Sequence, residues 1–150
     1  MIPSLLHAGV ALGIAFSPAA LAYDARVVEV ISGHQLVVMA GERRVALRLA
    51  GIEAPTGAAR YAIASRQSLI ALCGGEAVQI EAVGSRASGD EQRALVTCNG
   101  RNAGAEQLRR GMATLERGAE QPVALRQAEA AARSARRGVW APLPDAAARR

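Results

Sequence analysis

The stretch Arg-Leu-Ala-Gly-Ile-Glu-Ala-Pro-Thr, from Arg48 to Thr56, places a guanidinium and a carboxylate on either side of a glycine turn. Apolar residues alternate along the chain before this turn, so Arg48 should point to the face opposite the core. A guanidinium can donate two parallel hydrogen bonds to a phosphate, and a carboxylate such as Glu53 can bind a hard cation or pair with the arginine. The residue types therefore favour phosphate chemistry or a simple ion pair at the turn.

The elements that would position these residues are short strands and a few helices. The apolar patterns predict strands over residues 26–31, 35–40, 43–52, 77–83 and 93–98, and helices over residues 59–73, 103–110 and 122–139. Glycine turns join the first three strands, as in a meander. The order predicts a five-stranded OB-fold barrel with a helix between strands 3 and 4 and two C-terminal helices, an α+β fold.

Five segments, in the right order, resemble motifs of the staphylococcal nuclease (thermonuclease) family. The turn after Arg48 is similar to the family's Arg-Leu-x-Gly-Ile-Asp-Ala-Pro-Glu. The other four are residues 30–36 (similar to Val-x-Asp-Gly-Asp-Thr-Leu), 93–95 (Tyr-Gly-Arg-x-Leu), 108–113 (Leu-Val-x-x-Gly-Leu-Ala) and 131–140 (Ala-x-x-x-x-x-Gly-Leu-Trp). The resemblance covers residues 26–141 and implies the same barrel.

The resemblance also implies an activity, the calcium-dependent hydrolysis of phosphodiester bonds in DNA and RNA. Arg48 and Arg93 match the two arginines that clamp the phosphate, and Glu53 matches a carboxylate that holds the metal, so these three are the implied catalytic residues. His34 takes the place of the second metal carboxylate, and Thr56 that of the glutamate that activates water.

The differences from the family pattern alter the expected chemistry. Imidazole is a poor ligand for calcium although it binds zinc, nickel and copper, and an aliphatic hydroxyl is a weak base at neutral pH. The cofactor is thus calcium by resemblance, another divalent metal at His34 and Glu53, or none. The structural alternatives are a solvated His34 in a hairpin turn and an ion pair between Glu53 and Arg48.

Two principal functions follow from these observations. One is an exported nuclease with an altered site. The alternative is a non-catalytic module of the cell envelope, which binds nucleic acid or another phosphate-bearing anion through Arg48 and Arg93; a purely structural role is a third. The net charge is +5 and all 18 basic residues are arginine, which suits a polyanionic partner, although a GC-rich coding sequence would give the same bias. We expect a monomer.

The N-terminal residues predict export. Residues 1–22 contain no Asp, Glu, Lys or Arg and end in Ala20-Leu21-Ala22, an A-x-A cleavage site typical of a signal peptide. The apolar stretch between Pro3 and Pro18 is shorter than the roughly 20 residues of a membrane-spanning helix. An uncleaved anchor or a buried helix are the alternatives. We expect a signal peptide over residues 1–22, the barrel domain over 23–142, a flexible tail over 143–150, a secreted or periplasmic location, and no membrane span after cleavage.

Cys73 and Cys98 are the two cysteines of the chain. In an oxidising compartment an even number of cysteines favours a disulfide. Two separately buried thiols are the alternative. A bridge would connect the end of the first helix to a barrel strand.

Overall fold

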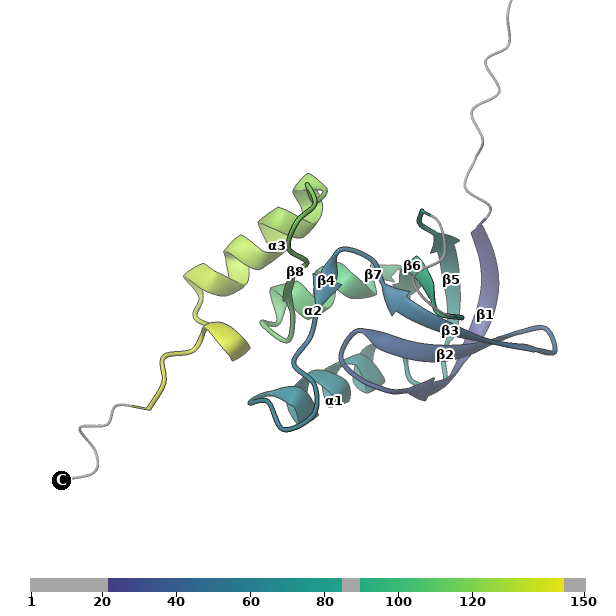
Figure 1. The fold of residues 1–150 in the computed structure, drawn as a ribbon, viewed down its shortest axis with the longest axis horizontal. Coiled ribbons are helices and arrows are strands. Elements are labelled where there is room, and N and C mark those ends of the chain that lie inside the picture. The colour runs from purple at the N-terminus through teal and green to yellow at the C-terminus, as the bar shows by residue number, and fades with distance from the viewer. Residues whose placement is uncertain (1–21, 85–89, 145–150) are drawn as a thin grey trace, which may run out of the picture.

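The computed structural model describes residues 22–84 and 90–144. The strands are β1 (Ala22–Val30), β2 (Gln35–Ala40), β3 (Arg43–Leu49), β4 (Ile52–Glu53), β5 (Ala77–Ala82), β6 (Gln92–Cys98), β7 (Arg101–Asn102) and β8 (Thr114–Leu115). The helices are α1 (Ala62–Cys73), α2 (Ala103–Arg109), α3 (Val123–Ser134) and the 3-10 turn η1 (Gly138–Trp140). Figure 1 shows the barrel on one side of the molecule and α3 and η1 on the other, with α2 between them.

The long strands form a closed barrel in the order β3-β2-β1-β5-β6. The pairs within this order are antiparallel, and β3 then pairs with β6 in parallel, which closes the sheet on itself. Helix α1 lies in the chain between β4 and β5, and α2 and α3 follow the barrel. The predicted five-stranded OB-fold barrel with its helices is therefore confirmed.

The third strand ends earlier than the sequence pattern predicted, at Leu49 and not at residue 52. Gly51 has a φ of 81°, a left-handed conformation that breaks the ladder. A Cβ at Gly51 would lie 2.5 Å from Oε1 of Gln121, so the position has no room for a side chain. After this turn β4 leaves the barrel sheet and pairs with β8, a pairing that apolar alternation alone did not reveal.

The final helix is also shorter than predicted, because α3 ends at Ser134 and not near residue 139. Arg136 and Gly138 have φ values of 52° and 51°, which turn the chain back toward the end of α2. There the backbone N–H of Val139 donates to the carbonyl of Gly111 over 2.8 Å. A Cβ on Gly138 would lie 2.0 Å from the same carbonyl oxygen, so the two glycines allow the backbones to touch.

The barrel interior is filled by apolar side chains that alternate along the strands. The largest fully buried ones on the strands are Leu36, Leu47, Leu49, Ile52 and Ile80, and Leu69 of α1 and Leu108 of α2 are fully buried as well. Cys73 at the end of α1 and Cys98 at the end of β6 form a disulfide, which confirms the predicted bridge. The bridge fastens α1 to the barrel wall beside this core.

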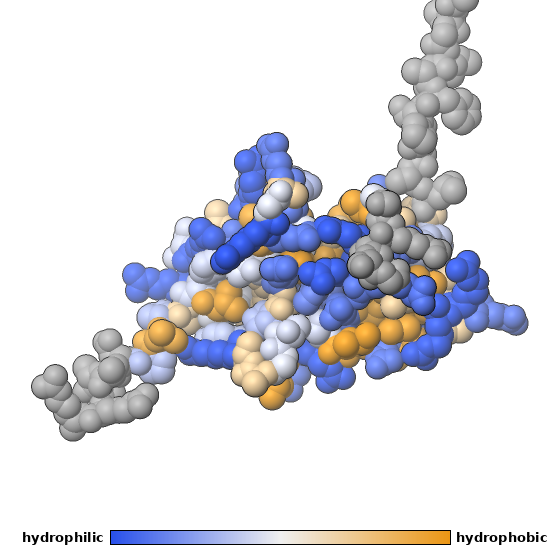
Figure 2. All heavy atoms as spheres, viewed as in Figure 1, coloured by the Kyte–Doolittle hydropathy of each residue, from blue (hydrophilic) through white to orange (hydrophobic). Residues whose placement is uncertain are grey.

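The outer surface is mainly hydrophilic, with hydrophobic atoms in separate groups on the face shown in Figure 2. Within residues 22–84 and 90–144, no helix has the length and apolar character needed to cross a membrane. The predicted signal peptide lies outside the described residues except for Ala22, which begins β1, and most of the predicted tail lies outside them as well.

Candidate functional site: an arginine pair on adjacent strands

Arg48 and Arg93 lie directly opposite each other on β3 and β6, as Cα partners of the parallel pair that closes the barrel. Their neighbours Leu47 and Ala94 are fully buried, so both arginines point to the outer face of the sheet. Their side chains are 26% and 33% exposed, respectively. The structure thus brings together the two arginines that the sequence placed 45 residues apart.

A polar residue on the next strand extends this row. Gln35 of β2 is the Cα partner of Arg48, so Gln35, Arg48 and Arg93 follow one another across three adjacent strands. The side-chain amide of Gln35 donates a hydrogen bond of 2.8 Å to Oε1 of Glu91, which directly precedes β6. The arginines therefore have a polar and acidic border on this side.

Arg48 forms the ion pair that the sequence offered as one interpretation of the turn. Its Nη2 lies 3.6 Å from Oε1 of Glu53, and the Glu53 side chain is 52% exposed. Pairing between β4 and β8 holds the backbone of Glu53 after the turn at Gly51. The single long contact and the exposed carboxylate make this a loose pair, of a kind that contributes little to stability.

Arg93 is held much more firmly, by a residue that the sequence analysis missed. Its Nη1 donates to Oε1 of Glu116 over 3.1 Å, and its Nη2 makes a second, shorter bond to Oε2. The Glu116 side chain is only 19% exposed. Glu116 follows directly after β8. In the sequence, its strongest signal as a site residue is that it is an acidic residue shortly after the Gly111-Met112-Ala113 motif.

His34 is buried, so the expectation of a solvated histidine in this turn was wrong. The turn is covered because Gly33 packs against Ser65 of α1 and its carbonyl accepts a hydrogen bond from the amide of Gln107 on α2. Nδ1 of His34 accepts a 3.2 Å hydrogen bond from the N–H of Ala54. Nδ1 therefore carries no proton and links the first hairpin to the turn after β4.

The charge environment of His34 joins the residues of this site. Burial and, next, the positive charge of Arg48 lower the pKa of the imidazole, while the carboxylates of Glu91, Glu53 and Glu116 act in the opposite direction. The net effect is a lowered pKa, which favours the neutral ring. The pKa of His34 thus depends on the charges of Arg48 and of three carboxylates, although His34 forms no ion pair of its own among the described residues.

The residues present do not fit the calcium site that the resemblance implies. Calcium requires several oxygen ligands, preferably carboxylates. Here Nδ1 of His34 is engaged by a backbone amide, Glu53 pairs with Arg48, and Thr56 is an exposed hydroxyl. In the described part of the chain, no group of three or more His, Cys, Asp or Glu side chains is arranged to hold a metal ion.

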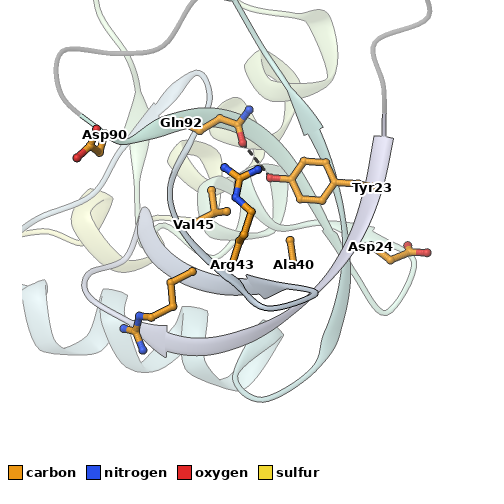
Figure 3. A pocket seen from close by; sticks show the side chains of 8 residues that line it. Tyr23, Asp24, Ala40, Arg43, Val45, Asp90 and Gln92 are labelled. Atoms are coloured by element: carbon orange, nitrogen blue, oxygen red, sulfur yellow. Dashed lines mark hydrogen bonds between the residues drawn. The ribbon is translucent and has the colours of Figure 1, made fainter.

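A separate cavity of about 640 Å³ lies beside the hairpin that joins β2 and β3. Figure 3 shows Tyr23, Gln92 and Arg43 pointing toward one another, and the hydroxyl of Tyr23 donates to Oε1 of Gln92 over 2.8 Å. Burial raises the pKa of Tyr23, and nearby Arg43 partly offsets the rise. The charged residues of the lining are two arginines and two aspartates, Arg43, Arg44, Asp24 and Asp90. The lining thus carries equal positive and negative charge, and it shares no residue with the Arg48 and Arg93 pair.

Comparison with known proteins assigns the chain to a family. The family model described as staphylococcal nuclease homologue matches residues 46–142, more than half of the chain. This span contains both arginines, Glu53, Thr56 and Glu116. A search of curated proteins found no match. With its closed barrel and the matched span, the chain belongs to the staphylococcal nuclease homologue family.

Proposed function

We propose that this domain acts on nucleic acid by holding a backbone phosphate between Arg48 and Arg93, and that it hydrolyses phosphodiester bonds slowly. Membership of the family supports a nuclease-like function and a nucleic-acid partner. The observation that carries the proposal is the parallel pairing of β3 with β6, which makes the two arginines direct neighbours on one outer face.

Two neighbouring guanidinium groups suit a phosphate for a simple physical reason. Each presents a planar fork of N–H donors that matches two phosphate oxygens, and each stays charged at any physiological pH. As negative charge increases on the phosphate oxygens during hydrolysis, fixed positive donors stabilise it more than they stabilise the ground state. Arg48 and Arg93 would therefore both bind and orient the reacting group.

The slow rate follows from the other residues at the site. Thr56, in the position of the water-activating glutamate, is an exposed hydroxyl, and the help of a general base is worth about 10² to 10⁴ in rate. Family members generally depend on calcium, and the donor set described above does not fit that ion. Glu53, half-exposed beside Arg48, is the carboxylate to which we assign a catalytic role, in the position of a metal-holding carboxylate of the family.

We also propose that the domain works outside the cytoplasm, in a secreted or periplasmic location. The uncharged N-terminal segment with its A-x-A site supports this, as does the disulfide between Cys73 and Cys98, since structural disulfides persist mainly in oxidising compartments. N-terminal sequencing of the mature protein should begin at Tyr23, and a sequence that begins at Met1 would contradict export by cleavage.

Binding of a labelled single-stranded oligodeoxynucleotide tests the phosphate site. We expect Arg48→Ala to weaken binding about tenfold or more, because it removes charge-assisted hydrogen bonds to the phosphate. Arg44→Ala is the matched control, since Arg44 lies on the same strand, is exposed, and pairs with Glu29 away from the site. It should change the dissociation constant by less than about threefold. Equal losses in the two variants would contradict the arginine site.

Hydrolysis is measured on the same proteins with calcium, manganese or zinc added in turn. Slow cleavage that is lost in Arg48→Ala and retained in Arg44→Ala is the expected result. Binding that depends on Arg48, without cleavage under any condition, would instead establish the non-catalytic alternative and remove the enzymatic part of the proposal.

A further inference from the structure

We infer that the Glu116 carboxylate competes with the ligand for Arg93. It occupies the position on Arg93 that a phosphate would take, so only an anion that can displace it binds to both arginines. This inference rests on the proposed phosphate site. Glu116 offers two oxygens to the two Nη atoms of Arg93. A phosphate would present two of its oxygens to the same donors in the same side-by-side geometry.

The two arginines differ in how available they are. Arg48 has one contact of 3.6 Å to a carboxylate that is 52% exposed. Arg93 makes two hydrogen bonds to a carboxylate that is 19% exposed. Because Arg48 can exchange its partner easily, an incoming phosphate should contact it first. Engagement of Arg93 then requires that Glu116 be displaced.

The backbone around Glu116 is fixed, so the side chain alone can make this exchange. The N–H of Glu116 donates to the carbonyl of Gly51 over 2.9 Å, and its own carbonyl accepts a hydrogen bond from the Gln121 side chain. Leu115 pairs with Ile52 in the short sheet of β4 and β8. A rotamer change at Glu116 would free Arg93 without unfolding of any strand.

The charge balance explains why this competition would be selective. The two arginines share the site with Glu53, Glu91 and Glu116, and all three carboxylates influence the buried ring of His34. Binding must therefore overcome local negative charge as well as the bond to Glu116. Anions with a single available oxygen should bind weakly, whereas groups with two anionic oxygens on one atom, as in a phosphate, can replace both hydrogen bonds to Arg93.

Glu116→Gln tests the inference, because the amide keeps the shape of the side chain and removes its charge. We expect the variant to bind the labelled single-stranded oligodeoxynucleotide about fivefold more tightly than the wild type. Glu29→Gln is the matched control, since it removes the same charge from an exposed pair with Arg44. It should tighten binding by less than about twofold. In an Arg93→Ala background, Glu116→Gln should give no gain.

The outcomes separate this inference from the proposed function. If the wild type binds through Arg48 and Glu116→Gln gives no more gain than Glu29→Gln, the competition is disproved and the phosphate site stands. A gain that persists without Arg93 would also overturn the inference, because it would be a general charge effect. If none of the proteins binds, the phosphate site itself fails. Thermal unfolding of each variant confirms that the compared proteins are folded.

Discussion

Adjacent residues of β3 lie on opposite faces of the barrel wall and in different surroundings. Leu47 is fully buried inside the barrel, among apolar side chains and near the wall that the disulfide fastens to α1. Arg48, the next residue, lies on the outer face in a partly exposed group of two arginines and three carboxylates. The difference leads us to expect that stability depends on the inner face, whereas the proposed phosphate site depends on the outer one. Mutation should therefore separate the two properties.

The largest expected effect is on the inner face. Leu47→Ala should lower the free energy of unfolding by about 2 to 5 kcal/mol, since it removes apolar contacts and leaves a cavity in a closed core. Urea denaturation measures this change. Oligonucleotide binding by the folded fraction should stay within about twofold of the wild type. A stability loss below about 1 kcal/mol, or a loss of binding without a loss of stability, would contradict the assignment of stability to the inner face and binding to the outer face.

Reduction of the disulfide should have the next largest effect. The bridge joins residues 25 positions apart, and for a loop of this length the loss of chain entropy in the unfolded state corresponds to about 3.5 kcal/mol. Denaturation of the oxidised and the reduced protein gives the difference directly, and a thiol count confirms each state. Oligonucleotide binding, measured at pH 7.5 without denaturant, should be the same for the oxidised and the reduced protein. Unequal binding would show that the inner wall and the outer face are coupled.

The smallest predicted effect concerns His34, which connects the two regions. Its pKa is lowered in the folded protein, so the unfolded chain, with a pKa of about 6.5, takes up the proton first as the pH falls. The folded state should thus lose stability as the pH falls below about 6.5, until the lower folded pKa is passed. The loss is about 1.4 kcal/mol for each unit by which the two pKa values differ.

His34→Asn is the matching variant for this measurement. The Asn side-chain oxygen can accept the hydrogen bond from Ala54 in place of Nδ1, and it does not titrate. The stability of the wild type relative to this variant should therefore decrease as the pH falls from 7.5 to 5. Parallel stability curves over this range would contradict the assigned role of the buried imidazole.

The barrel could be predicted from the sequence because its signals are local. Apolar patterns mark each long strand, glycine turns separate the first three, and the order of the predicted strands and helices is that of an OB-fold barrel. The pairing of Arg93 with Glu116 could not be predicted in this way, since it depends on β8 returning to β4 across the turn at Gly51. The burial of His34 likewise depends on Gln107 and Ser65 from two helices. Contacts of this kind arise only when distant segments pack.

The parallel pairing of β3 with β6 has a further consequence for the stability of the barrel. Arg48 and Arg93 are neighbours only where β3 pairs with β6, so a chain in which this pairing is open would lack the proposed phosphate site. A phosphate that contacts both strands would connect them and raise the melting temperature, increasingly so as its concentration exceeds the dissociation constant. Nucleic acid bound at the proposed site would then also help to keep the barrel closed.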